Sequence, residues 1–552
     1  MKMNRTGWLL VTALVAACDP APQTGTDPGT LTVALQTTGA SGTVYGLDAT
    51  LDLAGPETRQ LSLYHTDATY QVDVQSGTYA ATLSNYTLYI IEESGASTPV
   101  DEAELLSPNP TGVAVPGGGT ATLVLTFKTH GEEITFAEGT LEIELETIES
   151  SYWGTETPIG SSSGRAFPDV AVDAAGNAIV VWSDSDVHAT RYDAVADTWD
   201  TETLIGSGSY PRVAVDVLGN AIVVWIDSID DHVHAARYNA VAGTWDADIR
   251  IDSGSGSDSY YAVAVDAVGN ATVVWSRHDG GIFSRIHAAR YDASANTWGA
   301  EVCIDSSSDG ATHPEVAMDA VGNATVVWHQ SDSDYTPHIY TARYDAAADT
   351  WGADTRIDSG AGDANEPRVA VDAAGNATVV WFQSDGSGIH QIRAARYDAA
   401  TDTWGADTRI NSGSNSAFVA RVAVDVLGNA TVVWFQSDSS NISQIHAVRY
   451  DAAADTWGAD TRIDSSAGDA SFPEVAMDAV GNATVVWSQF DSSSVSNIYA
   501  ARFDVAANTW GADGVIESYS ENLEYPEVAS TESGISVAVW RQGDSIMANR
   551  YY

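Results

Sequence analysis

The stretch RYDAAADTWGADTRID, from Arg343 to Asp358, recurs along the chain in eight related forms. The variants begin with YWGTETPI at Tyr152 to Ile159, continue through TWDTETLI, TWDADIRI and TWGAEVCI, include TWGADTRI three times, and end with TWGADGVI at Ile516. A phrase repeated this often indicates architecture, and the chain is therefore interpreted first as an array of repeated structural units.

A tryptophan that ends the segment VVW marks each unit. It occurs at Trp182, Trp225, Trp275, Trp328, Trp381, Trp434, Trp487 and, as VAVW, at Trp540. The last five intervals between these tryptophans are each 53 residues long. Fixed periods of roughly 40 to 55 residues with several short strands per unit are typical of a β-propeller.

Four strands fit within one unit. In the fourth unit they are Pro314 to Asp319, Ala324 to Gln330, His338 to Asp345 and Thr350 to Ile357. The turn AVGN joins the first two, where Gly and Asn tolerate positive φ and the carboxylate of Asp319 is expected to cap the turn.

The two ends of the array predict how it closes. It begins with a lone fourth strand, Tyr152 to Ile159, and ends after a third strand, Ser545 to Tyr552. Together these make one complete blade, which predicts an eight-bladed propeller of residues 150–552 closed by pairing of the N- and C-terminal strands. Closure removes the free sheet edges that invite aggregation.

The hairpins of the unit resemble those of known propeller families. ARYDAAADTW, with Tyr344 seven residues before Trp351, resembles the outer hairpin of kelch repeats, and PRVAVDAAGNATVVW, from Pro367 to Trp381, is similar to an NHL-type repeat. The outer hairpin also resembles the Asp-box of sialidase-like propellers. These resemblances imply a propeller fold and leave its activity open.

The N-terminus has the features of a secretory leader. Basic residues precede a short apolar run, Trp8 to Ala17, and VAAC at Val15 to Cys18 resembles the lipobox of bacterial lipoprotein signal peptides. The resemblance implies a signal peptide of residues 1–17, lipidation of Cys18, and a cell-envelope location, which we expect to be the outer membrane or cell surface rather than the inner membrane. An ordinary secretory signal with an incidental cysteine is the alternative.

Two further segments separate the leader from the repeats. Residues 18–30 are rich in Pro, Thr and Gly and predict a flexible tether. Residues 31–149 alternate apolar and polar side chains in short runs, as in TYQVDVQSGTYAATLS, and predict a small antiparallel β-sandwich domain. The whole protein is thus expected to be all-β.

Charge limits the partners of the chain. The formal net charge is −51, with 75 acidic against 24 basic residues. Such a surface repels nucleic acid and anionic lipid, which leaves metal ions, cationic groups or neutral glycans as attractive partners. Solubility in a salty environment explains the same charge without any ligand. No cofactor is expected, and a calcium requirement stays open.

The second cysteine, Cys303, stands where sister repeats carry Arg356, Arg409 and Arg462. We interpret it as a drifted repeat position rather than a nucleophile or a metal ligand.

The connections that differ between repeats are the candidates for function. The turns DAVGN and YDAAADT hardly change, whereas the other two connections vary strongly and share one rim, because strands alternate in direction. An aromatic ring beside an amide suits sugar or peptide binding, which predicts rim contacts from His329, Gln330, Phe382, Gln383, Phe435 and Gln436. Each of these equally fits a residue that only finishes the second strand.

Two other series recur in the repeats. An arginine precedes Tyr or Phe in every unit, from Arg191 to Arg550, and is expected to pair with a repeat-invariant Asp such as Asp319 or Asp372. Histidines such as His188 and His446 enter the third strand of several units, where a packing role is expected because tyrosines replace them in others.

The sequence therefore predicts a lipid-anchored envelope protein that binds a glycan or protein ligand through the variable rim without catalysis. Two alternatives stay open: a sialidase-like glycoside hydrolase or polysaccharide lyase, which needs two suitably placed carboxylates, and a scaffold that binds nothing.

Overall fold

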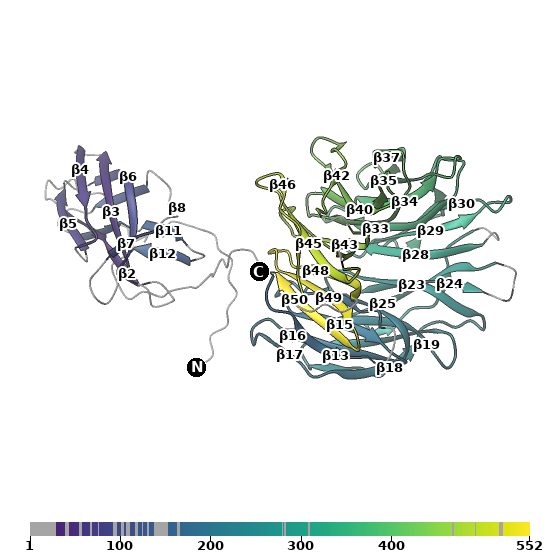
Figure 1. The fold of residues 1–552 in the computed structure, drawn as a ribbon. Coiled ribbons are helices and arrows are strands. Elements are labelled where there is room, and N and C mark those ends of the chain that lie inside the picture. The colour runs from purple at the N-terminus through teal and green to yellow at the C-terminus, as the bar shows by residue number, and fades with distance from the viewer. Residues whose placement is uncertain are drawn as a thin grey trace. The chain divides into compact units, whose positions relative to one another are not determined.

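The computed structural model describes residues 29–136 and 153–551 except for 39–43, 55–57, 67–68, 75–76, 92–96, 101–103, 106–110, 116–119, 124, 130–131, 163–165, 279, 281–282, 307–309, 466–467, 492 and 518–522. These residues form strands joined by turns, in two compact units that divide the chain after Ser151 (Figure 1). The predicted leader, most of the tether, and Cys18 lie outside the described residues. Over the described part of the chain, no helix has the length and apolar character needed to cross a membrane.

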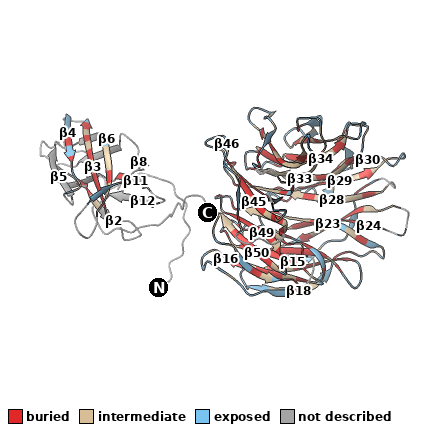
Figure 2. Ribbon diagram, in the orientation of Figure 1, coloured by how far each residue is buried: buried red, intermediate tan, exposed pale blue. Residues whose placement is uncertain are grey.

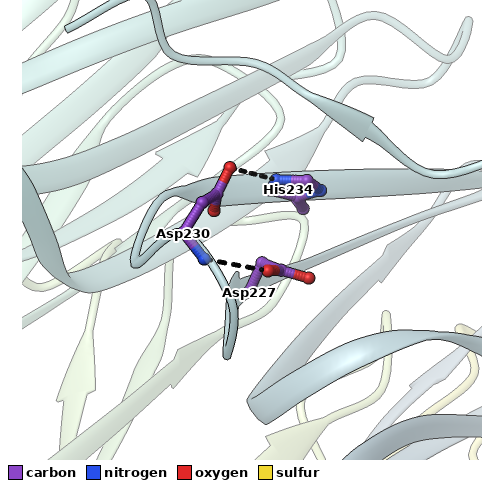
Figure 3. Close-up of side chains that lie close together, drawn as sticks. All are labelled: Asp227, Asp230 and His234. Atoms are coloured by element: carbon purple, nitrogen blue, oxygen red, sulfur yellow. Dashed lines mark hydrogen bonds and ion pairs between the residues drawn. The ribbon is translucent and has the colours of Figure 1, made fainter. Parts of the chain in front are cut away.

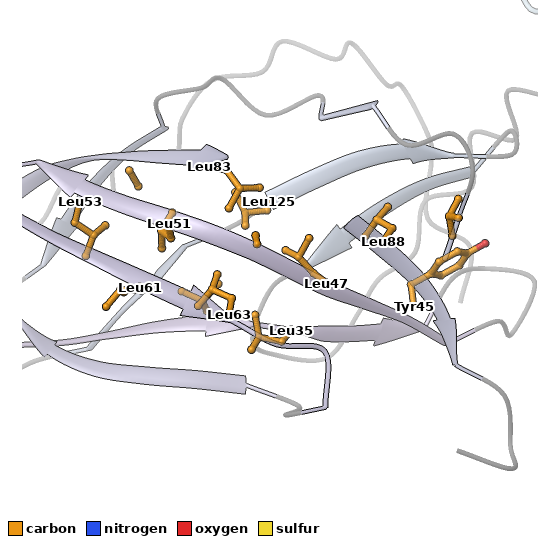
Figure 4. Packing of buried hydrophobic residues seen from close by; sticks show 14 residues of the cluster. Leu35, Tyr45, Leu47, Leu51, Leu53, Leu61, Leu63, Leu83, Leu88 and Leu125 are labelled. Atoms are coloured by element: carbon orange, nitrogen blue, oxygen red, sulfur yellow. The ribbon is translucent and has the colours of Figure 1, made fainter. Parts of the chain in front are cut away.

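The first unit is a β-sandwich. Its strands are β1 (Gly29–Ala34), β2 (Gln36–Thr38), β3 (Val44–Ala54), β4 (Thr58–Leu63), β5 (Thr69–Val74), β6 (Gly77–Ile91), β7 (Ser97–Pro99), β8 (Glu104–Leu105), β9 (Thr111–Val115), β10 (Thr120–Leu123), β11 (Leu125–Thr129) and β12 (Glu132–Phe136). The period-two pattern of β3 buries Leu47, Leu51 and Leu53 against Leu83 and Leu88 of β6 (Figure 4).

One pairing in this unit departs from the expected antiparallel sandwich. β1 pairs antiparallel with β5 on one side but parallel with β10 on the other. The chain therefore returns to β1 through a crossover, which turn-residue patterns do not reveal.

The second unit is an eight-bladed β-propeller. Blade 1 comprises β14 (Asp169–Val172), β15 (Ala178–Ser183), β16 (Asp186–Asp193) and β17 (Thr198–Trp199), and β18 (Thr203–Val215) runs from its outer edge into blade 2. Blade 2 continues with β19 (Ala221–Asp227), β20 (Val233–Asn239), β21 (Thr244–Trp245) and β22 (Ile249–Arg250). Blade 3 comprises β23 (Ser257–Val265), β24 (Ala271–His278), β25 (Arg285–Asp292), β26 (Thr297–Trp298) and β27 (Val302–Cys303).

The next blades repeat this plan. Blade 4 comprises β28 (Ala311–Met318), β29 (Ala324–Ser331), β30 (Pro337–Asp345), β31 (Thr350–Trp351) and β32 (Thr355–Arg356). Blade 5 comprises β33 (Ala364–Val371), β34 (Ala377–Ser384), β35 (His390–Asp398), β36 (Thr403–Trp404) and β37 (Thr408–Arg409). Blade 6 comprises β38 (Ala417–Val424), β39 (Ala430–Ser437), β40 (Ser443–Asp451), β41 (Thr456–Trp457) and β42 (Thr461–Arg462).

The last two blades complete the ring. Blade 7 comprises β43 (Ala470–Met477), β44 (Ala483–Phe490), β45 (Ser496–Asp504), β46 (Thr509–Trp510) and β47 (Gly514–Val515). Blade 8 comprises β48 (Leu523–Ser530), β49 (Ser536–Gln542), β50 (Ser545–Tyr551) and the N-terminal β13 (Thr157–Ser161), which pairs antiparallel with β50. The predicted fold class is confirmed.

The core of the propeller lies between blades. The second strand of each blade, such as β29, is buried on both faces because each sheet is covered by its two neighbours (Figure 2). The side chain of Trp328 is fully buried in a cluster that joins blades 3 and 4 through Val274 and Val326. Equivalent clusters fill the other junctions.

The fourth strand is shorter than predicted. Where a continuous strand from Thr350 to Ile357 was expected, the structure has the short pairs β31 and β32, interrupted at Gly352 to Asp354. The acidic residue in this interruption lies against the third strand of its blade. In blade 5 this residue is Asp407, which pairs with Arg393 of β35 at 2.6 Å.

The arginine series joins neighbouring blades, but by a different contact from the one predicted. Arg343 stacks on the Tyr397 ring of the next blade with its Cζ 3.7 Å from the ring centre, and six other members stack in the same way. Asp319 instead caps its turn, accepting hydrogen bonds from the backbone and side chain of Asn323. The carboxylate is therefore occupied, although Arg502 does pair with Asp478 at 3.2 Å.

Candidate functional site, an axial funnel

The innermost strand of each blade is bulged close to the variable rim. The register of seven of these strands shifts there, for example between Ser209 and Arg212. A β-bulge redirects a side chain and is one of the few places in a sheet that accept proline. Pro211, Pro314 and Pro367 occupy these bulges and are buried, so the residues on either side of them face the propeller axis.

The residue at the equivalent bulge position of each blade, which is followed by proline in six of the eight blades, forms the first layer of the axis, here called the collar. Its members are Phe167, Tyr210, Tyr260, His313, Glu366, Val419, Phe472 and Tyr525. Seven of them adopt positive φ, between 43° at Tyr260 and 58° at Tyr525. Non-glycine residues rarely adopt this conformation, which costs about 1–3 kcal/mol each and is concentrated at functional sites.

The residue two positions further on forms the second layer, here called the charged ring. Its members are Asp169, Arg212, Ala262, Glu315, Arg368, Arg421, Glu474 and Glu527. Arg212 of blade 2 lies 3.7 Å from Glu527 of blade 8, and Arg212 shares a cavity with Arg421 of blade 6, on the opposite side of the ring. Side chains from opposite blades meet only at the axis, so this layer lines the central channel.

Below the charged ring the channel becomes uniform. The next residues facing the axis are alanines in all eight blades, at Ala171, Ala214, Ala264, Ala317, Ala370, Ala423, Ala476 and Ala529. Two variable layers thus lie above an invariant one. Positions that are identical in every blade serve the blade, so the collar and the charged ring are the layers free to serve a ligand.

The collar and the charged ring together line the part of the channel that is here called the funnel, and one side of the funnel forms a distinct pocket of about 150 Å³. Four collar rings line it, and their centres follow one another at 5.6 Å from Phe472 to Tyr525, 4.5 Å from Tyr525 to Phe167 and 4.4 Å from Phe167 to Tyr210. Arg212, Arg421, Glu474 and Glu527 complete its lining. The pocket belongs to one side of the ring and is not repeated in every blade.

The charges in the pocket are not evenly matched. Arg421 Nε is held by Glu474 Oε1 at 2.6 Å, whereas one nitrogen of Arg212 lies 3.7 Å from Glu527 and 3.9 Å from Asp169, beyond hydrogen-bonding distance. The Arg212 side chain is 46% exposed although it lies deep in the ring, because it lines the channel.

This environment changes the titration of the acids. Burial, with the charges of Glu474 and Asp169, raises the pKa of Glu527 well above its usual range, although Arg212 and Arg421 oppose the change. Burial also raises the pKa of Asp169, opposed by Arg212 and by the N–H that Val213 donates to its carboxylate at 2.8 Å. The funnel therefore holds a carboxyl group prone to stay protonated.

The six predicted rim contacts divide into two groups. Gln330, Gln383 and Gln436 are buried, and each accepts a hydrogen bond at 3.2 Å from the indole of the VVW tryptophan in its own blade. Their amides are thus used within the blades.

The other three of the six lie beside the collar. His329 stacks on the collar residue His313 at 4.8 Å, and burial lowers the pKa of His329 to about 4. Phe382 and Phe435 both pack on Phe418, with ring centres 5.4 and 5.9 Å away. Ligand contact by any of the six remains a prediction.

The histidines of the third strands are not brought together. His188, His287 and His446 each lie against the buried tryptophan of their own blade and pair with an acid of the fourth strand, for example His446 with Asp460 at 2.7 Å. This arrangement agrees with the expected packing role.

Two groups in blades 2 and 3 have the residue types of a metal site. In Figure 3, Asp230 contacts His234 at 3.3 Å, while the carboxylate of Asp227 accepts the N–H of Asp230 at 3.3 Å and so serves as a turn cap. The other group, His232 with Asp252 and Asp258, already surrounds the guanidinium of Arg277, which lies 2.9 Å from Asp252 and 2.8 Å from Asp258. A cation of the protein's own thus occupies this second group.

Cys303 lies opposite His287 in the strand register, as Arg356 lies opposite Tyr340 in the next blade. The Sγ of Cys303 donates a hydrogen bond to the carboxylate of Asp305 at 3.1 Å. Burial, with the charge of Asp305, raises the pKa of this thiol to about 12. Such a thiol stays protonated and unreactive at neutral pH.

The sequence contained a signal for the funnel that the rim prediction did not use. The rim prediction rests on residues that differ between repeats in the connections between strands. Residues also differ within the first strand, on either side of the bulge proline, as at Tyr210 and Arg212, while the residues that follow them hardly change.

Fold and site together define an eight-bladed β-propeller with one blade-specific pocket at its axis. No family model matches the chain, and no curated protein matches it. Solved structures with a similar fold include an ulvan lyase, a polysaccharide lyase, at 8% identity over 71% of this chain and 95% of that one, with a TM-score of 0.43. The NanB sialidase of Streptococcus pneumoniae matches at 10% identity over 95% and 94%, with a TM-score of 0.34.

A protein of unknown function from Dyadobacter fermentans matches at 11% identity over 54% of this chain and 96% of that one, with a TM-score of 0.37. At these identities and scores, the similarities carry no information about activity.

Proposed function

We propose that this protein is a lipid-anchored binding protein of the bacterial cell envelope, with a kelch- or NHL-like repeat array, that holds a glycan in its axial funnel without cleaving it. The anchor is Cys18, and the predicted tether, whose last two residues Gly29 and Thr30 already belong to β1, links the anchor to the folded units.

The collar is the observation that carries this proposal. Seven side chains are retained at positive φ, where glycine fits without strain, while glycine is used at the positive-φ position of the first-hairpin turns, such as Gly322 and Gly375. Aromatic rings such as Phe472 and Tyr525 offer flat faces to sugar rings, and the paired charges below them offer donors and acceptors to hydroxyl groups.

A specific observation favours hydrolysis or elimination as the second candidate. Glu527 has a raised pKa, as a general acid needs, and Asp169 lies near the same guanidinium nitrogen. Their oxygens are consequently no more than about 8 Å apart, which does not exceed the widest spacing of paired glycosidase carboxylates. Binding without catalysis is preferred because Asp169 is tied to the backbone of Val213 and the cavity is small.

The test is a polysaccharide and glycan screen with the soluble Cys18→Ser chain, with and without calcium, scored for retention and for released product. Retention without new reducing or unsaturated ends is the expected result. Released product that disappears in Glu527→Gln supports the enzyme instead. Retention of no polysaccharide or glycan contradicts glycan binding.

A further inference from the structure

The axial pocket carries an excess of negative charge. The charged ring around it holds four carboxylates, those of Asp169, Glu315, Glu474 and Glu527, against the three guanidiniums of Arg212, Arg368 and Arg421, and Glu315 pairs with Arg368 at 3.2 Å. Arg421 is neutralised by Glu474 at 2.6 Å. Arg212 is then shared between Glu527 and Asp169 at the longer distances of 3.7 and 3.9 Å. Among the described residues, the ring thus has one carboxylate more than it has guanidinium groups.

Aromatic rings form the wall above this excess charge. Phe472, Tyr525, Phe167 and Tyr210 come from four consecutive blades, and the planes of neighbouring rings are inclined by 36° to 55°, close to the eighth of a turn between blades. The side chains of Tyr210 and Phe472 are 54% and 45% exposed. Electron-rich aromatic faces beside a carboxylate attract organic cations, and above all alkylated ammonium groups.

The volume of the cavity and the net charge of the protein both favour a small organic cation. A cavity of about 150 Å³ holds a group the size of benzene, which is comparable to a trimethylammonium head and smaller than a whole sugar chain. The net charge of −51 concentrates cations near the surface. Calcium needs six to eight oxygen ligands, which a wall of four aromatic rings does not provide.

We infer that this pocket binds an organic ammonium group, with the cation against the aromatic wall of blades 7, 8, 1 and 2 and its charge balanced by Glu527. The inference rests on the proposed function, because it specifies which part of a ligand enters the funnel: a charged amino group of a sugar, or a quaternary ammonium substituent on the glycan.

Binding of the cation is linked to protonation. The charged groups around Glu527 are Asp169 on β14, Arg212 on β18, Arg421 on β38 and Glu474 on β43. In the free protein the proton on Glu527 relieves the excess negative charge, and an ammonium group takes over that role. Binding therefore releases a proton and weakens as pH falls through the pKa of Glu527.

The experiment is calorimetric titration of the soluble Cys18→Ser chain with tetramethylammonium, glucosamine and neutral N-acetylglucosamine, in two buffers of different ionisation enthalpy. Tetramethylammonium and glucosamine distinguish a quaternary from a primary source of the charge. Either one binding with proton release, while N-acetylglucosamine does not bind, is the expected result.

Variants locate the site. Tyr525→Ala is expected to weaken the cation at least about tenfold, and Glu527→Gln to weaken it and abolish the proton release. The matched controls are Phe382→Ala, an aromatic outside the pocket, and Glu524→Gln, an acid of the same strand as Glu527 that pairs with Arg541 outside the pocket, and both are expected to bind normally.

The inference is overturned if neither cation binds, if the neutral sugar binds equally well, or if Glu527→Gln leaves affinity and proton release unchanged. Glycan retention in the screen together with no cation binding overturns this inference alone. Cation binding without glycan retention overturns the glycan proposal and leaves the pocket assignment standing.

Discussion

At the scale of single residues, the collar keeps side chains at backbone conformations that cost conformational stability. Tyr210 and Val419 adopt positive φ of 55°, and for the β-branched Val419 this conformation is a clear outlier. Neither position carries the glycine that the same fold uses at positive φ in its first-hairpin turns, such as Gly322. The strain is explained if the side chains are needed at the axis.

This explanation predicts opposite effects on stability and on binding. Tyr210→Gly is expected to leave the free energy of unfolding unchanged or raise it by about 1 kcal/mol, since the strain is relieved, and to lower ligand affinity. Val419→Gly relieves the same strain at a collar position outside the pocket and serves as the control: it is expected to change the free energy of unfolding in the same direction as Tyr210→Gly and to leave the affinity for tetramethylammonium unchanged. Denaturant unfolding and calorimetry measure both, and a destabilised Tyr210→Gly contradicts the prediction.

The pKa of Glu527 predicts a pH dependence of stability. Because this pKa is raised in the folded state, the unfolded chain loses its proton first as pH rises, and the free energy of unfolding falls between the unfolded and the folded pKa. Glu527→Gln is expected to lack this fall, so that its advantage over the wild type appears only as pH rises above the unfolded pKa. Urea midpoints across the acid-to-neutral range test it, and parallel curves for the two proteins refute it.

At the scale of elements, blade 3 departs from its neighbours at two coupled positions. Arg277 stands where blades 4 to 7 have Gln, and Asp258 stands where they have Ala, and the two side chains are buried and hydrogen-bonded at 2.8 Å. Arg277→Gln alone leaves the buried carboxylates of Asp258 and Asp252 without their cation and is expected to cost about 3–5 kcal/mol. Asp258→Ala alone is expected to cost less, because Arg277 keeps its contacts with Asp252 and Glu301.

The double variant restores the pattern of the sister blades and is expected to be close to wild type in stability. A double-mutant cycle by thermal or urea unfolding gives the coupling energy. Additive losses for the two substitutions contradict a compensated pair.

The repeats explain which elements were predictable from sequence. The turn at Asp319 and the third strand ending at Asp345 follow from local residue preferences, and the structure has both. The interruption of the fourth strand at Gly352 and the parallel pairing of β1 with β10 depend on contacts distant in sequence, which local patterns do not contain. The funnel depends on distant contacts in the same way. The variable residues Arg212 and Glu527 can be recognised in the sequence, but only closure of the ring brings them side by side.

At the scale of the whole molecule, the ring is closed by its two ends. β13 pairs with β50, and Arg550 stacks on Tyr192 of blade 1 at 3.9 Å. Closure fixes eight first strands around one axis and so converts eight variable positions into a single site. A linear array has no such site.

The anchor makes a prediction at this scale. Cys18→Ser is expected to abolish incorporation of labelled fatty acid and to release the protein from the membrane fraction, because no other lipid attachment is proposed. The fold lies far along the chain, so its circular dichroism is expected to be unchanged. A variant that stays in the membrane fraction after a salt wash argues against the lipoprotein proposal.

The measurement that tests the account most directly compares the funnel with the rim. Once the screen identifies a retained glycan, its affinity is measured for Phe472→Ala/Tyr525→Ala and for the matched pair Phe382→Ala/Phe435→Ala. Binding in the funnel predicts a loss of affinity of about a hundredfold or more in the first variant and little change in the second. Normal affinity in the collar variant and lost affinity in the rim variant would contradict it and return the site to the variable rim.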